Sequence, residues 1–345
     1  MDFLGLLRKY PNNRPLSDQE IEHKLTQKIR LNIFPRYQLS VVEMNSTYLE
    51  SVDKWFGWKG FLTLLAVAIF SIFGGLLGGN LLLDVISYLV SSDAMDDDTK
   101  FYLWNDIGML VVLALPPTIL SIWLLKKDSF AFTHYPMRFN RLTRIVHVFR
   151  PDGTILSVPW DEIFFTLGHM PFWDDWEVQG HILESDQATV KETFALSYIG
   201  SMNKNDRKNI GTEPSPDDYV RAHWEFIRRY MEEGPHAVLD QVQFCMPVNR
   251  HHETVRGGFE RAFANIAGGN VFICCVMFPF LVVLGICRIF AMRTSKIPEW
   301  PAEVQSTSTI HANDPFAIYG APNGDRVPLF PEAARSAGIE FRRSV

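Results

Sequence analysis

Three groups of residues carry side chains that could do chemistry. His251, His252 and Glu253 offer metal ligands, but adjacent histidines point in different directions and no further ligand follows at a telling distance. The stretches WDEIFF (160–165) and WDDWE (173–177) combine carboxylates with aromatic rings, as carbohydrate hydrolases do. Such an enzyme needs two carboxylates at a defined separation across the sugar, and the sequence shows no such geometry. We therefore expect neither a metal site nor a catalytic pair there.

Motifs for other common chemistries do not occur. The sequence has no Walker loop, dinucleotide-binding glycine fingerprint, GxSxG elbow or HExxH zinc helix. Of the four cysteines, Cys274, Cys275 and Cys287 fall within one apolar block, which supports neither a disulfide framework nor a zinc site. The net charge of -6 indicates no general affinity for nucleic acid. We expect a protein that is not an enzyme and uses no cofactor or metal.

Three apolar blocks dominate the predicted architecture. The first, residues 60–83, has no charge in 24 positions, which exceeds the roughly 20 residues that a helix needs to cross a bilayer core. The second, residues 107–125, contains Pro116 and Pro117, which membrane helices tolerate because their neighbours satisfy the freed carbonyls. The third, residues 267–287, either spans the membrane or turns back as a re-entrant segment. The sequence therefore predicts two or three transmembrane helices.

Lysine and arginine set the expected orientation, because they are retained on the cytoplasmic side of short loops. Nine lie in residues 1–59 and 16 of the 33 lie in residues 126–266, whereas residues 84–106 contain only Lys100. The N-terminal and central regions are therefore expected in the cytoplasm, and the 84–106 loop outside. Simple alternation places the tail from residue 293 outside, and a re-entrant third segment leaves it inside.

The region after the second block has the pattern of an antiparallel sheet. RIVHVF (144–149) and TILSVPW (154–160) alternate apolar and polar residues around RPDG, in which Pro151 suits the first central turn position and Gly153 a positive φ. Further strands are expected at 176–184 and 191–200. Together they predict a β-rich domain.

An amphipathic helix is expected to close this domain. SPDDYVRAHWEFIRRYMEEGP begins at the cap candidate Ser215 and stops at Gly234. Strands followed by one closing helix are similar in architecture to a pleckstrin-homology-like domain, an analogy that does not supply function. The fold class is an α+β membrane protein. The expected segments are a cytoplasmic N-terminal segment (1–58) with a short helix at 17–31, a transmembrane hairpin (59–127), the cytoplasmic β-rich domain (128–262), a third transmembrane or re-entrant segment (263–292) and an irregular tail (293–345).

Four glycines of the first block could mediate helix packing. Gly74 with Gly78 and Gly75 with Gly79 form two overlapping small-xxx-small pairs, which allow helices to approach closely. Packing against the second span is the default, and a second copy of the chain or a foreign helix are the alternatives. The three apolar cores lack the ionisable residues that mark transport pathways, which argues against a pump or carrier.

Basic residues around the predicted β-hairpin could contact anionic lipid. Arg138, Arg141, Arg144 and Arg150 are candidates for such a pocket, and a solvated basic face explains them more simply.

Several stretches in a fixed order resemble one family. PMRFNRLTRIVHVFRPDGTILSVPWDEIFF, HWEFIRRYMEEGP, a glycine-led apolar span and MRTSKIPEWPAEV are similar to those of uncharacterised bacterial integral membrane proteins encoded beside type VI secretion effectors. The resemblance covers most of the chain from about residue 130 to residue 304. It names no catalytic residue.

The resemblance implies a setting in the inner membrane of a Gram-negative bacterium, with the 84–106 loop in the periplasm. It implies an immunity protein that binds and neutralises a membrane-acting effector. From the residues, we expect that protein to bind through the helix face bearing the four glycines, aided by the cytoplasmic domain. An effector-loading accessory or membrane scaffold is the alternative, and a lipid-sensing membrane module is a third. The expected partners are membrane lipid and a cognate effector or secretion component.

Overall fold

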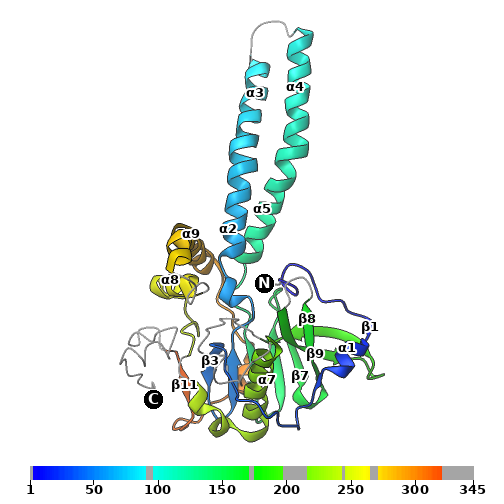
Figure 1. Cartoon of the computed structure of the whole chain (residues 1–345), viewed down its shortest axis with the longest axis vertical. Helices are drawn as coiled ribbons and strands as arrows, with labels where there is room; N and C mark the ends of the chain where they lie inside the picture. The colour runs from blue at the N-terminus through cyan, green and yellow to red at the C-terminus, as the bar shows by residue number, and fades with distance from the viewer. Residues whose placement is uncertain are drawn as a thin grey trace.

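The computed structural model of the chain describes residues 3–90, 96–170, 175–196, 216–242, 245–264 and 271–320. A long helical hairpin stands on a domain that contains two antiparallel sheets (Figure 1). Three helices in these residues are long and apolar enough to cross a membrane. The expectation of a mixed α+β protein with candidate membrane spans is confirmed.

The larger sheet contains the predicted β-hairpin. Its turn places Gly153 at φ +87°, and the Gly153 N–H donates to the carbonyl of Arg150 at 2.9 Å. The two strands of this hairpin pair in register from Ile145 with Pro159 to Phe149 with Ile155. In spatial order the six strands are β11 (Ile318–Tyr319), β3 (Val41–Met44), β4 (Tyr48–Ser51), β5 (Met137–Asn140), β6 (Ile145–Phe149) and β7 (Ile155–Pro159).

The smaller sheet contains the two further strands expected from the sequence. The first of them begins and ends one residue before its predicted bounds, and the second begins at Thr189. The five strands in spatial order are β1 (Arg14–Pro15), β10 (Thr189–Ala195), β9 (Asp175–Leu183), β8 (Phe164–Met170) and β2 (Lys24–Leu25).

The predicted closing helix is α7 (Pro216–Glu233), and Ser215 lies outside the described residues. The apolar face of α7 packs into the main core, where Trp224 contacts the rings of Phe165 and Trp160 at centroid distances of 4.6 and 5.5 Å. The opposite face is also covered, because the N-terminal segment crosses it. Glu225 accepts a hydrogen bond from the backbone N–H of Leu31 at 3.1 Å and is fully buried.

The N-terminal 58 residues do not form a separate segment. The helix expected at 17–31 is only α1 (Asp18–Glu22), which Ser17 caps through a capping box with Glu20. It ends there because the chain enters β2 and pairs with β8. The strands β1 and β2 belong to the smaller sheet, and β3 and β4 belong to the larger one.

The described part of the tail contains two short elements after α9. Residues 302–306 form α10 (Ala302–Ser306), and β11 pairs antiparallel with β3. Residues 321–345 lie outside the described part of the chain.

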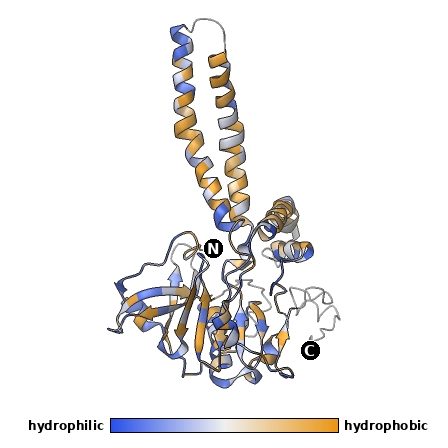
Figure 2. Ribbon diagram, turned by 180° about the vertical axis from the view of Figure 1, so that it is seen from behind, coloured by the Kyte–Doolittle hydropathy of each residue, from blue (hydrophilic) through white to orange (hydrophobic). Residues whose placement is uncertain are grey.

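The helical hairpin is longer than the two predicted spans. Its first arm runs through α2 (Phe61–Ile69), η2 (Phe70–Gly78) and α3 (Gly79–Val90), and its second through α4 (Asp97–Met109), η3 (Leu110–Ala114) and α5 (Leu115–Asp128). At 1.5 Å per residue, the 30-residue first arm is roughly 45 Å long. Asp84 and Asp106, expected in a loop, therefore lie on helices, and the second arm is hydrophilic near its tip (Figure 2).

Both arms contain a stretch of wide, π-helical turns, η2 and η3. The stretch η3 comes just before Pro116 and Pro117, which cannot donate to the carbonyls of the preceding turn. The Thr118 hydroxyl donates to the carbonyl of Ala114 at 2.7 Å and so gives this carbonyl a hydrogen-bond partner.

The third apolar helix is α9 (Val271–Thr294), and it packs against α8 (Val255–Ala264). In Figures 1 and 2 the long hairpin lies in the plane of the picture and α9 is seen nearly end-on, so α9 crosses the direction of the hairpin. The remaining short helices are the 3₁₀ turns η1 (Phe56–Trp58), η4 (Trp160–Glu162), η5 (Pro235–Ala237) and η6 (Leu239–Gln241).

Two buried histidines predict that the β-domain loses stability in acid. Burial lowers the pKa of His134 to about 3 and that of His223 to about 4, from 6.5. The unfolded chain then binds protons that the folded chain does not, so the free energy of unfolding falls as the pH drops from about 6.5 toward 4. At pH 5 each histidine should contribute a loss of roughly 2 kcal/mol relative to pH 7.

Thermal unfolding followed by tryptophan fluorescence at pH 7 and pH 5 measures this loss. His223→Asn keeps a donor for the nearby carbonyl of Arg36 and should reduce the pH dependence. Equal unfolding temperatures of the unsubstituted protein at both pH values would contradict the expectation.

Candidate functional site

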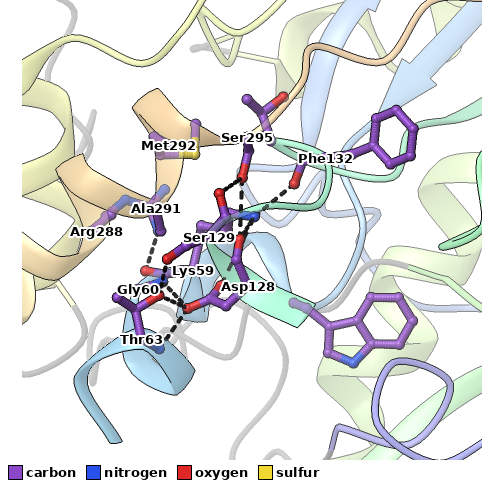
Figure 3. Close-up of polar contacts among 12 residues, drawn as sticks. Lys59, Gly60, Thr63, Asp128, Ser129, Phe132, Arg288, Ala291, Met292 and Ser295 are labelled. Carbon is purple, nitrogen blue, oxygen red and sulfur yellow. Dashed lines mark hydrogen bonds and ion pairs between the residues drawn. The ribbon is translucent and has the colours of Figure 1, made fainter. Parts of the chain in front are cut away.

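The base of the hairpin is closed by Asp128, the last residue of α5 (Figure 3). One of its carboxylate oxygens accepts the backbone N–H groups of Gly60 and Thr63 at 3.0 and 2.9 Å, and the Thr63 hydroxyl at 2.7 Å. These groups form the N-terminus of α2, where N–H groups lack partners within the helix and negative charge is favourable. The end of the second arm therefore caps the start of the first.

The ammonium group of Lys59 lies near the second carboxylate oxygen of Asp128 and balances its charge. This ammonium donates to the carbonyls of Asp128 and Phe132, the latter at 2.7 Å, and lies 3.9 Å from the second Asp128 carboxylate oxygen. A cation at the C-terminus of a helix is favourable. Burial nevertheless lowers the pKa of Lys59 to about 8, although the nearby carboxylates of Asp128 and Asp53 oppose that change.

The C-terminus of α9 joins the same cluster. The Ser295 hydroxyl lies within hydrogen-bonding distance of the carbonyls of Asp128 and Ser129, at 3.2 and 3.1 Å, and the Thr294 hydroxyl also donates to Ser129. Three helix ends, those of α2, α5 and α9, thus meet within one hydrogen-bonded cluster.

Arg288 links α9 to the start of the hairpin. The side chain is 1% exposed and donates to both carboxylate oxygens of Glu253, at 2.7 and 3.0 Å, and to the carbonyl of Phe56 at 2.9 Å. Its backbone approaches Gly60 so closely that a Cβ added at Gly60 would lie 2.5 Å from the Arg288 Cα. Gly60 also has φ +94°, a conformation that favours glycine. The residue type at Gly60 therefore sets how closely α9 approaches.

A second buried arginine lies beside this pair. Arg261 of α8 is 2% exposed, and its guanidinium lies 5.2 Å from the centroid of the Phe56 ring, which Arg288 approaches at 5.0 Å. Burial, reinforced by the charge of Arg288, lowers the pKa of Arg261 to about 9. The Glu253 carboxylate, which pairs with Arg288, lies near enough to Arg261 to oppose this lowering.

The four glycines of the first arm divide between two faces. A Cβ added at Gly74 would lie 3.1 Å from the Thr118 hydroxyl, and one at Gly78 would lie 3.3 Å from the Cβ of Ala114. These two glycines therefore face the second arm. Near Gly75 and Gly79 an added Cβ would meet only carbonyls of their own helix, so this pair faces away from the second arm.

The four candidate arginines do not form one surface. Arg138 is 8% exposed and donates to one carboxylate oxygen of Glu50 at 2.8 and 2.6 Å, between the rings of Tyr48 and Trp300. It is a buried ion pair inside the domain and cannot contact a bilayer.

The strand β6 separates Arg141 and Arg144, in the turn before it, from Arg150, which follows it. Arg144 and Arg150 each pair with a carboxylate at 2.6 Å, that of Asp161 and that of Glu192 respectively. Arg141 lies 3.4 Å from a backbone carbonyl between β3 and β4. The expectation of one basic lipid-binding pocket around the β-hairpin is wrong, because the arginines are dispersed and mostly paired.

The histidine and carboxylate side chains considered above for catalysis or metal binding make structural hydrogen bonds and ion pairs. His252 lies 2.8 Å from a backbone carbonyl of α9, and Glu253 and Asp161 form the ion pairs described above. Glu177 pairs with a lysine of the N-terminal segment at 2.5 Å, and Asp174 lies outside the described residues. In the part of the chain that the structure describes, no group of three or more His, Cys, Asp or Glu side chains could hold a metal ion.

Two cavities flank the larger sheet. One, of about 490 Å³, is lined by the buried pair Glu50 and Arg138 and by the tail around Trp300. The other, of about 660 Å³, lies beside the end of α5 and is lined by Trp123 and Lys127 together with residues of both sheets. The second cavity lies at the foot of the apolar hairpin.

Asp128 and Lys59 were missed as site residues by reasoning from the sequence. Each stands at the domain-side end of an apolar block, the position where a charge has to be accommodated as the chain leaves the apolar region. That placement is a usable signal, although it does not tell which charges pair.

Comparison with known proteins identifies a family. Residues 114–312 match a family of unknown function (DUF6708). The match covers more than half of the chain, and the chain belongs to this family. No curated protein and no solved structure matches it.

Replacing Gly60 should detach α9 from the hairpin. In Gly60→Ala the new Cβ collides with the backbone of Arg288 at a strained φ, and we expect a loss of about 2–4 kcal/mol in the free energy of unfolding. Thermal unfolding of the purified full chain, together with the rate at which a maleimide labels buried Cys287, measures the effect. Exposed Cys275 serves as the internal reference.

Gly108→Ala is the matched control. An added Cβ at Gly108 meets nothing within 4 Å, so this variant should unfold and label like the unsubstituted protein. If Gly60→Ala behaved like Gly108→Ala, the close contact between α9 and the hairpin would be wrong.

Proposed function

We propose that this member of the DUF6708 family is a membrane-anchored binding protein and not an enzyme. The observation that carries the proposal is the hairpin, whose most apolar windows are only 22% and 17% buried within the protein. Apolar residues make up most of its length (Figure 2), and many of the large ones are exposed, among them Leu76, Leu83 and Val112. Soluble monomers rarely expose contiguous apolar patches of more than a few hundred Å², whereas lipid accommodates such a surface.

The distribution of charge supports one orientation of this hairpin. Lys126 and Lys127 lie at its base, and Asp97 and Asp98 lie near its tip. Because lysine and arginine favour the cytoplasmic side, the β-domain is cytoplasmic and the tip is periplasmic. In this proposal the membrane is the bacterial inner membrane, as the resemblance in the sequence implies.

The third apolar helix does not cross the membrane in this arrangement. Before α8, Met246 donates to the carbonyl of Val41 in β3, and after α9, Lys296 exchanges backbone hydrogen bonds with residues 131 and 133. Both flanks are therefore attached to the same domain. A single crossing would put its two flanks on opposite sides, so α9 lies in the membrane interface, with exposed apolar residues such as Phe272 and Phe278 in lipid.

This arrangement predicts the side of the tail. Green fluorescent protein fused after Val345 should fluoresce, and alkaline phosphatase inserted at residues 91–95 should be active, because the first reporter works in the cytoplasm and the second in the periplasm. Phosphatase activity from a fusion after Val345 would show instead that α9 crosses the membrane.

The order of elements supports a pleckstrin-homology-like interpretation of the domain. Four strands of the larger sheet, β4 to β7, are followed by three of the smaller sheet, β8 to β10, and then by α7. The hairpin enters this series between β4 and β5. We treat this similarity as architectural, since fold does not determine function.

The partner in this proposal is a membrane-acting effector encoded beside the gene, and the role is immunity. Gly74 and Gly78 are occupied by the second arm, so a foreign helix would pack on the face that bears Gly75 and Gly79. Small residues on that face allow close approach of a partner helix. The type VI setting comes from the resemblance in the sequence.

Protection of sensitive bacteria tests this role. Cells that express the neighbouring effector should survive when the full chain is co-expressed. The double variant Gly75→Leu, Gly79→Leu should lose protection, at unchanged protein level in the membrane fraction, because leucine side chains keep the partner helix at a distance.

Gly108→Leu is the control, since it adds the same side chain to the other arm at a position with no neighbour. It should protect fully. Full protection by the double glycine variant would refute the helix-face mechanism. Death of cells with the unsubstituted protein would refute immunity and favour an effector-loading accessory.

A further inference from the structure

The cavity at the foot of the hairpin has the position and lining of a lipid site. Its volume of about 660 Å³ is within the ~300–1,000 Å³ range of ligand pockets. Trp123 and Lys127, from the last two turns of α5, form one part of its lining. Tryptophan and lysine at the end of a span are the residues that sit at the membrane interface, so the cavity adjoins lipid if the hairpin spans as proposed.

The interior of the cavity is apolar on the side of the two sheets. Val148 of β6 and Leu156 of β7 are cross-strand partners and are both partly exposed to it, and Phe194 of β10 and Leu6 of the N-terminal segment also line it. The ion pair between Arg150 and Glu192 connects the end of β6 to β10 beside the cavity. This ion pair links the two sheets at one end of the cavity, and an apolar chain in the cavity would bury surface that is now open.

The polar part of the lining offers cations. Lys9 and Lys127 both line the cavity, and neither takes part in an ion pair within the described ranges. Lys127 lies 6.0 Å from the ring of Trp123. The charge of Arg150, in contrast, is matched by Glu192, and Asp152 adds a negative charge at the same end. The two lysines are therefore the groups available to a phosphate.

We propose that this cavity binds one acyl chain of a membrane phospholipid, with the lipid phosphate held by Lys9 and Lys127. The proposal rests on the membrane insertion of the hairpin and gives the anchored domain a specific lipid ligand. It places lipid recognition at the foot of α5 and away from the paired arginines Arg138 and Arg144.

Native mass spectrometry of the full chain tests the site. The protein is purified in detergent and offered phosphatidylglycerol, phosphatidylethanolamine or oleate in separate samples. We expect one phospholipid to be retained per chain, with phosphatidylglycerol preferred. Val148→Trp, which fills the cavity, should lose that lipid, and the double variant Lys9→Ala, Lys127→Ala should bind phosphatidylglycerol about fivefold more weakly for each lysine removed.

Lys126→Ala is the matched control, because Lys126 is exposed beside Lys127 and does not line the cavity. It should retain lipid normally. A second readout covers the case in which Val148→Trp fails to fold: added phosphatidylglycerol should raise the unfolding temperature of the unsubstituted protein and raise it less in the double lysine variant.

Three outcomes would overturn the proposal: retention of oleate without phospholipid, equal retention by a folded Val148→Trp variant, and no retained lipid at all. Carbonate extraction of membranes is run in parallel. Release of the chain by carbonate would show that the membrane anchor itself fails, whereas a firmly inserted chain that binds no lipid refutes only the cavity site.

Discussion

The two ends of the hairpin must return to neighbouring strands, and the rest of the structure depends on this constraint. The chain leaves the larger sheet after Ser51 and re-enters it at Met137, and these two residues are paired in register. The segment between them therefore has to begin and end at the same point on the sheet. Asp128 meets this requirement by capping the helix that Gly60 begins, so the hairpin closes through hydrogen bonds that also satisfy exposed helix ends.

A closed base fixes the domain relative to the hairpin. Because Ser295 and Arg288 attach the end of α9 to the same cluster, α9 is held across the foot of the hairpin. The cluster buries several charges, and breaking a buried pair by removing one partner costs about 3–5 kcal/mol. The junction is therefore expected to act as a rigid connection, and a partner or lipid that binds near α5 contacts a domain with a defined orientation.

Residue patterns within a short stretch of sequence predicted those elements that such a stretch specifies by itself. The β6–β7 hairpin follows from alternation around a turn with Gly153, and the apolar face of α7 follows from helical spacing. The strands β3 and β4 escaped prediction because all of their residues are buried, so no alternation marks them. The helices extend beyond the predicted span limits, since they continue through polar residues such as Asp84.

The candidate site shows the same difference between residues that a local pattern marks and residues that it does not mark. Gly74 and Gly78 were chosen as packing candidates from a periodicity of four residues, and a Cβ added at either would lie close to the second arm. Arg138 was assigned to a surface because its neighbours in the sequence are basic, but its partner Glu50 lies opposite it on β4. That pairing requires β4 and β5 to lie side by side, although the hairpin separates them in the sequence. Contacts between residues on either side of a long insertion depend on register, which no local pattern encodes.

Membrane depth is the most direct test of the claim that the hairpin alone crosses the bilayer. Spin labels at Leu76, Phe278 and Ile286, each introduced singly into the full chain in vesicles, report depth through their relative exposure to oxygen and to a water-soluble nickel complex. The account predicts that Leu76 lies deep in the bilayer and that Phe278 and Ile286 lie at similar, shallow depths. A label at Phe278 as deep as that at Leu76 would contradict it, because α9 would then enter the bilayer core as a span or as a re-entrant segment.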